Sequence, residues 1–126
     1  MAIKHVLVID DEGYWLDMME MLLYRLGYQA TLTENADEGL TLLKENPQGY
    51  GTVLLDLMMP MMSGLEFLQE MAKDVSLSHI QVILQTGSQN HTIIQEALHA
   101  GAQGFLQKPF DLSDLAAALD ANSLID

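Results

Sequence analysis

Short apolar runs alternate with segments of helical periodicity along the whole chain. Nearly continuous apolar residues at 3–9, 53–55 and 82–84 predict three strands buried on both faces of a sheet, and 29–33 and 104–107 predict two more. Between these strands, apolar residues recur at spacings of three and four, which predicts amphipathic helices. The alternation of five strands with five helices predicts an α/β fold, a parallel sheet with helices on both faces.

Polar residues mark where several of these helices begin. Asn35 precedes Glu38 by three residues, and Ser63 precedes Glu66 by three, so we expect a capping box at the start of the second and third helices. Asp111 is expected to cap the last helix. Three helices are expected to end at, or just before, a glycine or a proline: Gly27, Pro47 and Gly101.

The carboxyl ends of the strands hold the residues that suggest chemistry, because ligands of such sheets bind beyond these ends. The first predicted strand ends in Asp10, Asp11 and Glu12, the third in Asp56, and the fifth in Lys108. If the first and third strands are neighbours, Asp10, Asp11 and Asp56 converge. Two carboxylates about 4 Å apart repel by about 4 kcal/mol at an effective dielectric of about 20, so a positive charge must offset them.

Mg²⁺ suits such a group of carboxylates. Hard oxygen ligands without histidine or cysteine favour this ion, which keeps several waters and takes one or two carboxylates. We predict Mg²⁺, with Mn²⁺ as a substitute, and Lys108 supplies a further positive charge that brings the total of the group to zero. These groups suit phosphoryl transfer, in which a carboxylate becomes an aspartyl phosphate and the Thr86 hydroxyl donates to a phosphoryl oxygen.

Composition narrows the range of partners. The chain has 126 residues, which suits one domain at roughly 150 residues per domain, and 49% of them are apolar. Its net charge of −13 argues against nucleic acid or an anionic membrane as a partner. The sequence contains no cysteine, no apolar run of bilayer length and no recognisable signal peptide. We therefore expect a cytoplasmic protein of one domain that binds neither nucleic acid nor membrane directly.

Four segments, taken together and in order, are similar to one known family. They are Asp10-Asp11-Glu12, Asp56 to Glu66 (DLMMPMMSGLE), Thr86-Gly87, and Gly101 to Phe110 (GAQGFLQKPF). These segments resemble the receiver domain of two-component response regulators, of the kind found in chemotaxis regulators, and the resemblance covers the whole chain. It implies a doubly wound, flavodoxin-like (βα)5 fold with strand order 2-1-3-4-5. It also implies one receiver domain over residues 1–126, with no effector domain in this chain.

The resemblance implies roles for the acidic residues. Asp56 is the expected phosphoacceptor. Asp10, Asp11, Asp56 and the backbone carbonyl of Met58 are expected to hold Mg²⁺, directly or through water. The implied function is a phosphorylation-activated signalling switch whose phosphodonor is a phosphohistidine on a sensor histidine kinase or a histidine phosphotransfer protein. Such a chain assists its own phosphorylation and dephosphorylation and is not a metabolic enzyme.

The resemblance also implies how the signal is relayed. Lys108 is expected to contact the phosphoryl group, Thr86 to close on it, and Phe105 to turn inward when Thr86 moves. The implied output surface consists of the fourth helix, the fifth strand and the fifth helix, and homodimers of the family form through this face. From its residue type alone, Phe105 is most simply a core residue.

Two other functional classes remain open from the residues. A phosphatase of the haloacid-dehalogenase type would use Asp10 as its nucleophile, although Glu12 then stands where that family has a second aspartate. A flavin-binding module of the same fold would need a loop rich in Ser, Thr and Gly after the first strand, where the acidic run would repel a phosphate. Substitution separates the receiver from the phosphatase, because the receiver needs Asp56 and the phosphatase needs Asp10.

Several positions are unusual for the receiver family. Met58, two residues past Asp56, and Ser88, two past Thr86, flank the family's route for the attacking water, and we hypothesise that the apolar Met58 slows self-hydrolysis. Gln85 needs hydrogen-bond partners if it is buried. The methionines within 58–62 fit either gap-filling in the core or an adaptable docking surface.

Overall fold

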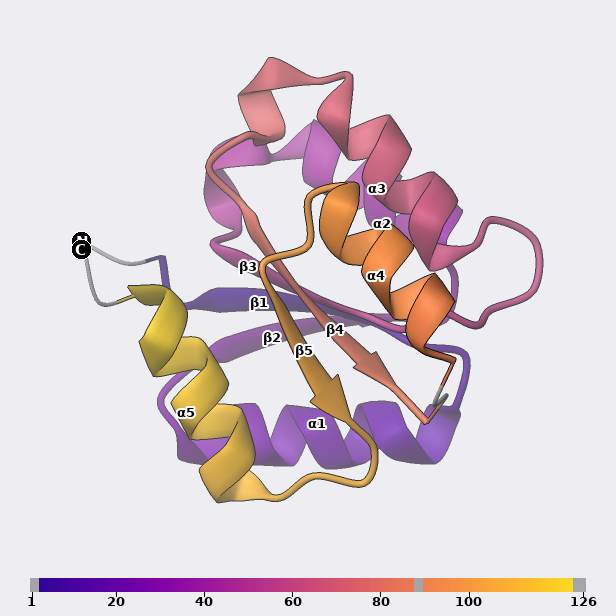
Figure 1. Cartoon of the computed structure of the whole chain (residues 1–126). Coiled ribbons are helices and arrows are strands. Elements are labelled where there is room, and N and C mark those ends of the chain that lie inside the picture. The colour runs from indigo at the N-terminus through magenta and orange to yellow at the C-terminus, as the bar shows by residue number, and fades with distance from the viewer. Residues whose placement is uncertain (1–2, 88–89, 124–126) are drawn as a thin grey trace.

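A five-stranded parallel sheet forms the centre of the computed structural model, which describes residues 3–87 and 90–123. Its strand order is β2-β1-β3-β4-β5, as the family resemblance predicts. Helices α1 and α5 cover one face of the sheet, and α2, α3 and α4 cover the other, so the fold is doubly wound (Figure 1). Within the described residues, no helix is both long and apolar enough to cross a membrane.

The elements follow the predicted alternation closely. The strands are β1 (His5–Ile9), β2 (Gln29–Thr33), β3 (Thr52–Leu55), β4 (Gln81–Thr86) and β5 (Gly104–Gln107). The helices are α1 (Gly13–Arg25), α2 (Ala36–Glu45), α3 (Gly64–Ala72), α4 (His91–His99) and α5 (Leu112–Ser123), with short 3₁₀ turns η1 (Pro47–Gly49) and η2 (Val75–Leu77). The first strand begins at His5 rather than at residue 3, because β2, its partner, begins opposite His5 at Gln29.

Two hydrophobic cores lie on the two faces of the sheet. Alternate residues of a strand point to opposite faces, so Leu7 and Ile9 of β1 pack with α2, α3 and α4, whereas Val6 and Val8 pack with α1 and α5. The central strands are therefore apolar at nearly every position, and this explains the continuous apolar runs in the sequence.

The helix boundaries confirm most of the predicted caps. Ser63 and Glu66 form the capping box at the start of α3. The Asp111 carboxylate accepts from the backbone N–H of Asp114 at 2.9 Å. The capping box predicted for Asn35 and Glu38 is wrong. The Asn35 side chain caps α2, but the Glu38 side chain accepts from the Thr33 hydroxyl instead of from the backbone of Asn35. Helical segments end as predicted before Pro47 and near two glycines with positive φ: Gly27 at +86° and Gly101 at +125°.

Strand register and one glycine position the functional residues. Ile9 of β1 lies opposite Leu55 of β3, so the next residues, Asp10 and Asp56, leave the sheet side by side. The backbone N–H of Asp56 donates to the Ile9 carbonyl at 3.0 Å. A Cβ on Gly64 would lie 2.9 Å from the Asp56 carbonyl oxygen, so only glycine lets α3 begin directly against this loop.

Candidate functional site

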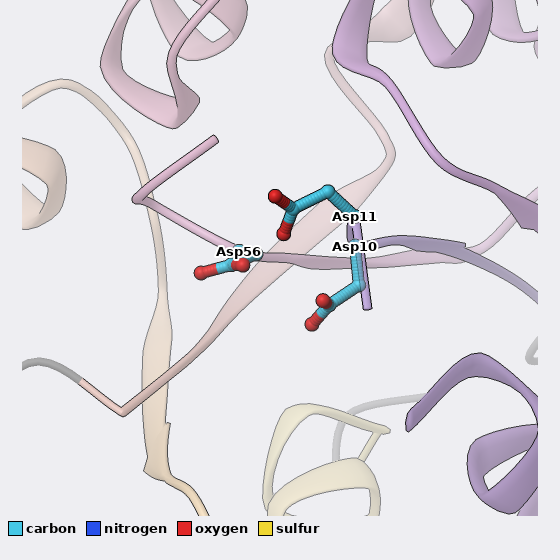
Figure 2. A group of neighbouring side chains, drawn as sticks. All are labelled: Asp10, Asp11 and Asp56. Atoms are coloured by element: carbon cyan, nitrogen blue, oxygen red, sulfur yellow. The ribbon is translucent and has the colours of Figure 1, made fainter. Parts of the chain in front are cut away.

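Three carboxylates converge at the carboxyl end of the sheet, as the sequence predicts. Asp10, Asp11 and Asp56 each offer one oxygen, and these oxygens all lie within 4.8 Å of one another. Figure 2 shows the Asp10 and Asp11 side chains, which come from adjacent residues after β1, extending toward the side where Asp56 follows β3. Asp10 is 0% exposed and Asp56 5%, whereas Asp11 is exposed.

Lys108 reaches this group from the end of β5. Its Nζ lies 2.6 Å from Asp10 Oδ2, 2.8 Å from Glu12 Oε1 and 3.9 Å from Asp56 Oδ2. It also lies 4.9 Å from the centroid of the Trp15 ring, a cation–π distance. The predicted lysine is therefore in place, but its two short contacts are to Asp10 and Glu12.

The contact between Glu12 and Lys108 was missed by the sequence reasoning. Glu12 binds Lys108 through one carboxylate oxygen and accepts from the Tyr14 hydroxyl at 2.8 Å through the other. Its position directly after the two aspartates was the available signal. Three carboxylates thus face Lys108 and Asp11 adds a fourth to the cluster, so without a metal the cluster carries an excess of negative charge.

Gln85 is buried and both ends of its amide are satisfied. Its Nε2 donates to Asp10 Oδ2 at 3.1 Å, and its Oε1 accepts from the Trp15 indole N–H at 3.1 Å. Asp10 Oδ1 accepts from the backbone N–H of Glu12 at 3.0 Å. The requirement that a buried Gln85 find hydrogen-bond partners is therefore met by two residues far away in sequence.

Burial and mutual repulsion hold the two buried carboxyl groups away from their ordinary titration range. Desolvation raises the pKa of Asp10, although its bonds from Lys108 and Glu12 oppose this. Desolvation and the charge of Asp10 raise the pKa of Asp56 from 3.8 to about 6. Desolvation lowers the pKa of Lys108, but its hydrogen bonds to Asp10 and Glu12 outweigh this and leave the pKa raised. Asp56 is thus a carboxyl group whose ionisation the fold disfavours, and a nearby cation would favour it.

The remaining predicted site residues lie at the end of β4, after β3 and on β5. Thr86 is buried at the end of β4, and its carbonyl accepts from the backbone N–H of Lys108 at 2.8 Å. The backbone N–H of Met58 donates to Asp56 Oδ1 at 3.3 Å. Phe105 on β5 is 37% exposed, so the interpretation of Phe105 as a core residue is wrong. Ser88 lies outside the described residues.

The methionines after Asp56 divide into two pairs. Met59 is buried and Met62 packs against the same core, so these two fill gaps as predicted. Met58 and Met61 are 55% and 84% exposed. Gap-filling is therefore wrong for this second pair.

The donor set fits a hard divalent cation. Among the described residues, Asp10, Asp11 and Asp56 are the one group of acidic, histidine or cysteine side chains arranged to hold a metal ion. All three offer oxygen, which Mg²⁺ and Mn²⁺ prefer. A divalent cation would also offset the charge that the single lysine leaves uncompensated.

Comparison with known proteins agrees with this geometry. The family model for the response regulator receiver domain matches residues 6–120. The uncharacterized transcriptional regulatory protein YkoG of Bacillus subtilis is 35% identical over 117 residues, which are 93% of this chain and 50% of that protein. Chemotaxis protein CheY-3 of Vibrio cholerae is 34% identical over 116 residues, 91% of this chain and 88% of that protein. The solved structure of Vibrio cholerae CheY4 has a TM-score of 0.86 at 25% identity and covers 95% of this chain and 98% of that chain.

Fold and site together define a doubly wound α/β protein with an acidic cluster at the carboxyl end of its sheet. The chain belongs to the response regulator receiver domain family. Receiver domains are phosphorylation-activated switches of two-component signalling rather than metabolic enzymes. They bind Mg²⁺ at an acidic pocket and interact with histidine kinases or phosphotransfer proteins. This chain spans half the length of YkoG and most of CheY-3.

Proposed function

We propose that Asp56 is the phosphoacceptor of this receiver domain. The observation that carries the proposal is the convergence of Asp10, Asp11 and Asp56 within 4.8 Å, with Lys108 Nζ 3.9 Å from Asp56. A carboxylate oxygen of Asp56 forms the bond to phosphorus, and the P–N bond of a donor phosphohistidine breaks with its electron pair going to the imidazole. The donor is a sensor histidine kinase or a histidine phosphotransfer protein.

The residues around Asp56 have distinct tasks in this proposal. Asp10, Asp11, Asp56 and the Met58 carbonyl would hold Mg²⁺, for which Mn²⁺ would substitute. When bound, the ion would supply positive charge to the phosphoryl oxygens. Lys108 supplies a second positive charge beside the phosphoryl group. Phosphorylation of Asp56 adds negative charge to a cluster of carboxylates, and the Lys108 ammonium offsets part of it. The chain thereby assists both its own phosphorylation and the later hydrolysis, in which water attacks phosphorus, the P–O bond to Asp56 breaks, and inorganic phosphate and the Asp56 carboxylate are released.

The conformational response is part of the same proposal. The Thr86 hydroxyl closes on the phosphoryl group, and Phe105, which is partly exposed on β5, turns inward as Thr86 moves. The output then leaves through α4, β5 and α5, and a homodimer through this face remains a prediction. The extent of one receiver domain over residues 1–126, the cytoplasmic location and the lack of direct binding to nucleic acid also stay predictions.

The geometry favours Asp56 over Asp10 as the nucleophile. Asp10 is fully buried, and its two oxygens together accept from Lys108, Gln85 and the backbone of Glu12. Glu12, which a phosphatase would need as its acid, is ion-paired to Lys108. The Asp56 carboxylate accepts from the backbone N–H of Met58 and lies nearer to solvent than that of Asp10.

Intact mass spectrometry tests the proposed acceptor. The chain is incubated with acetyl phosphate, with and without Mg²⁺, as wild type, Asp56→Asn and Asp10→Asn. We expect a gain of one phosphoryl group in the wild type that requires Mg²⁺ and is lost in Asp56→Asn. A gain that survives Asp56→Asn but is lost in Asp10→Asn would contradict the proposal and favour the phosphatase-like alternative.

A further inference from the structure

One buried chain of hydrogen bonds connects the acidic cluster to the core between the sheet and α1. The Trp15 indole N–H donates to Gln85 Oε1, and Gln85 Nε2 donates to Asp10 Oδ2, each at 3.1 Å. Asp10 and Gln85 are 0% exposed and Trp15 is 3% exposed. Water therefore does not replace these bonds, and each of these groups depends on the next for its orientation.

We propose that Gln85 and Trp15 are positioning residues that orient the Asp10 carboxylate for Mg²⁺. This inference rests on the proposed metal site and names the residues that support one of its ligands. Neither residue touches the ion. They act through Asp10, in the way that partners of metal-ligating groups fix ligand orientation in other proteins.

The distribution of donors over the two Asp10 oxygens supports this inference. Oδ2 accepts from both Gln85 Nε2 and Lys108 Nζ, whereas Oδ1 accepts, within the described part of the chain, only from the backbone N–H of Glu12. A carboxylate has about four lone-pair sites, two on each oxygen. Two donors therefore occupy Oδ2, and Oδ1 keeps a lone pair that it can offer to a cation.

Trp15 supports both donors to Oδ2 at once. Its indole N–H fixes the amide of Gln85, and its ring face lies under the Lys108 ammonium at 4.9 Å. Phe110 packs against the same ring edge to face, with centroids 4.9 Å apart and planes at 81°. The indole is thus held from the side, and it in turn fixes the two groups that set the rotation of the Asp10 carboxylate.

An apolar residue at position 85 would break this arrangement at both ends. It would leave the Trp15 N–H without its acceptor and remove one of the two donors from Asp10 Oδ2. The carboxylate would then be free to rotate toward Lys108, which is its remaining partner on that oxygen. The metal ligands would no longer be preorganised, so binding of the ion would have to order them.

Calorimetric titration with Mg²⁺ tests the inference on the whole chain. Gln85→Met removes the amide at similar volume, and Trp15→Phe keeps a ring but removes the indole N–H. We expect Gln85→Met to weaken Mg²⁺ binding by about tenfold to a hundredfold, the range for lost partners of metal ligands. Trp15→Phe should also weaken it, and should add little in the Gln85→Met background, because both act through one bond chain.

Gln81→Met is the matched control, since Gln81 lies on the same strand and donates to Thr52 at the opposite end of the sheet. Its Mg²⁺ affinity should equal that of the wild type. Circular dichroism confirms that each variant is folded, and phosphorylation of Gln85→Met by acetyl phosphate should recover as Mg²⁺ is raised.

The outcomes separate this inference from the proposed function. A folded Gln85→Met chain that binds Mg²⁺ within about twofold of the wild type overturns the role of Gln85, and Trp15→Phe provides the same test of Trp15 if Gln85→Met does not fold. If the wild type itself does not bind Mg²⁺, the proposed metal site is wrong, and with it the inference.

Discussion

The two ends of the sheet hold polar side chains in opposite ways. Near the amino end, two bonds join neutral groups: Gln81 Nε2 donates to Thr52 Oγ1 at 3.1 Å, and Gln103 Oε1 accepts from the backbone N–H of Val82 at 2.7 Å. At the carboxyl end, three aspartates lie together with one lysine. Neutral pairs stabilise the fold whatever the solution contains, whereas the charged cluster is stable only to the extent that cations balance it.

This difference explains why one end of the sheet is suited to switching. Burial raises the pKa of Asp56 to about 6, so near neutral pH its ionised form is held against a desolvation penalty. Binding of a cation, or a change in the charge on Asp56, therefore strongly changes the free energy of the carboxyl end of the sheet. The Gln81 and Gln103 bonds have no comparable response, since neither joins a titrating group.

Removal of Lys108 should have the largest effect on the free energy of unfolding. Lys108→Met leaves Asp10 and Asp56 without their cation, and breaking a buried ion pair costs about 3 to 5 kcal/mol of unfolding free energy. Urea denaturation without metal near neutral pH measures this change. Lys73→Met is the matched control, because Lys73 forms an equally short but exposed pair with Glu70, and its loss should cost less than about 1 kcal/mol.

The origin of the Lys108 effect can be tested in a second background. If uncompensated charge is the cause, Asp10→Asn should recover part of the stability that Lys108→Met loses. If Lys108→Met lowers the free energy of unfolding equally in the wild type and in Asp10→Asn, the effect instead comes from lost packing of the lysine side chain against Trp15.

A pH series should separate the charge of Asp56 from the rest of the fold. The pKa of Asp56 is raised from 3.8 to about 6, so the folded chain holds this proton more tightly than the unfolded chain. The contribution of Asp56 to stability must then fall as pH rises through that window, by up to about 3 kcal/mol at about 1.4 kcal/mol per unit. Asp10, Asp11 and Lys108 face the group and belong to the same titration.

Asp56→Asn provides the reference for this measurement. Without metal, its advantage in unfolding free energy over the wild type should grow between about pH 4 and about pH 7, and added Mg²⁺ should reduce the advantage. Curves that stay parallel across the whole range would show that Asp56 is not held against a desolvation penalty.

A neutral bond at the amino end should respond to none of these conditions. Thr52→Val removes the hydroxyl that accepts from Gln81 and should lower the unfolding free energy by about 1 kcal/mol. The loss should be the same at acidic and neutral pH and with or without Mg²⁺. A metal-dependent loss would mean that the two ends of the sheet are energetically coupled.

The smallest expected effect concerns the lifetime of the phosphoryl group. Met58 is 55% exposed, and its backbone donates to Asp56 Oδ1, so its apolar side chain adjoins the proposed route of the attacking water. Met58→Asn should speed dephosphorylation several-fold, measured by intact mass after the donor is removed. Met61→Asn, at the neighbouring exposed methionine, is the control and should leave the rate unchanged.

Local pattern was enough to predict the alternation of strands and helices and to place the aspartates at the carboxyl ends of the first and third strands. Parallel strands bring their carboxyl ends to one edge of the sheet, but the prediction that these two strands are neighbours came from the family resemblance, which implies the order 2-1-3-4-5. The capping box at Asn35 was wrong because Glu38 found a nearer partner in Thr33, a choice that depends on how β2 meets α2. Local spacing contains no information on such competition between partners.

Contacts between distant segments could not be predicted in this way. That Gln85 needed partners followed from its place in an apolar strand, but Trp15 lies 70 residues away and Asp10 75. The pairing of Lys108 with Glu12 spans 96 residues. These contacts depend on the packing of α1 and the end of β5 against the sheet, which residue types alone do not specify.

Reductive trapping of the phosphorylated residue tests the central claim most directly. The chain is phosphorylated with acetyl phosphate and Mg²⁺, treated with borohydride, digested and mapped by mass spectrometry. Borohydride reduces an acyl phosphate to the alcohol with release of phosphate, so phosphorylated Asp56 should be recovered as homoserine at position 56 in the metal-containing sample alone. Homoserine at position 10 or 11, or a phosphoryl group retained on a histidine, would contradict the assignment of Asp56 as the acceptor.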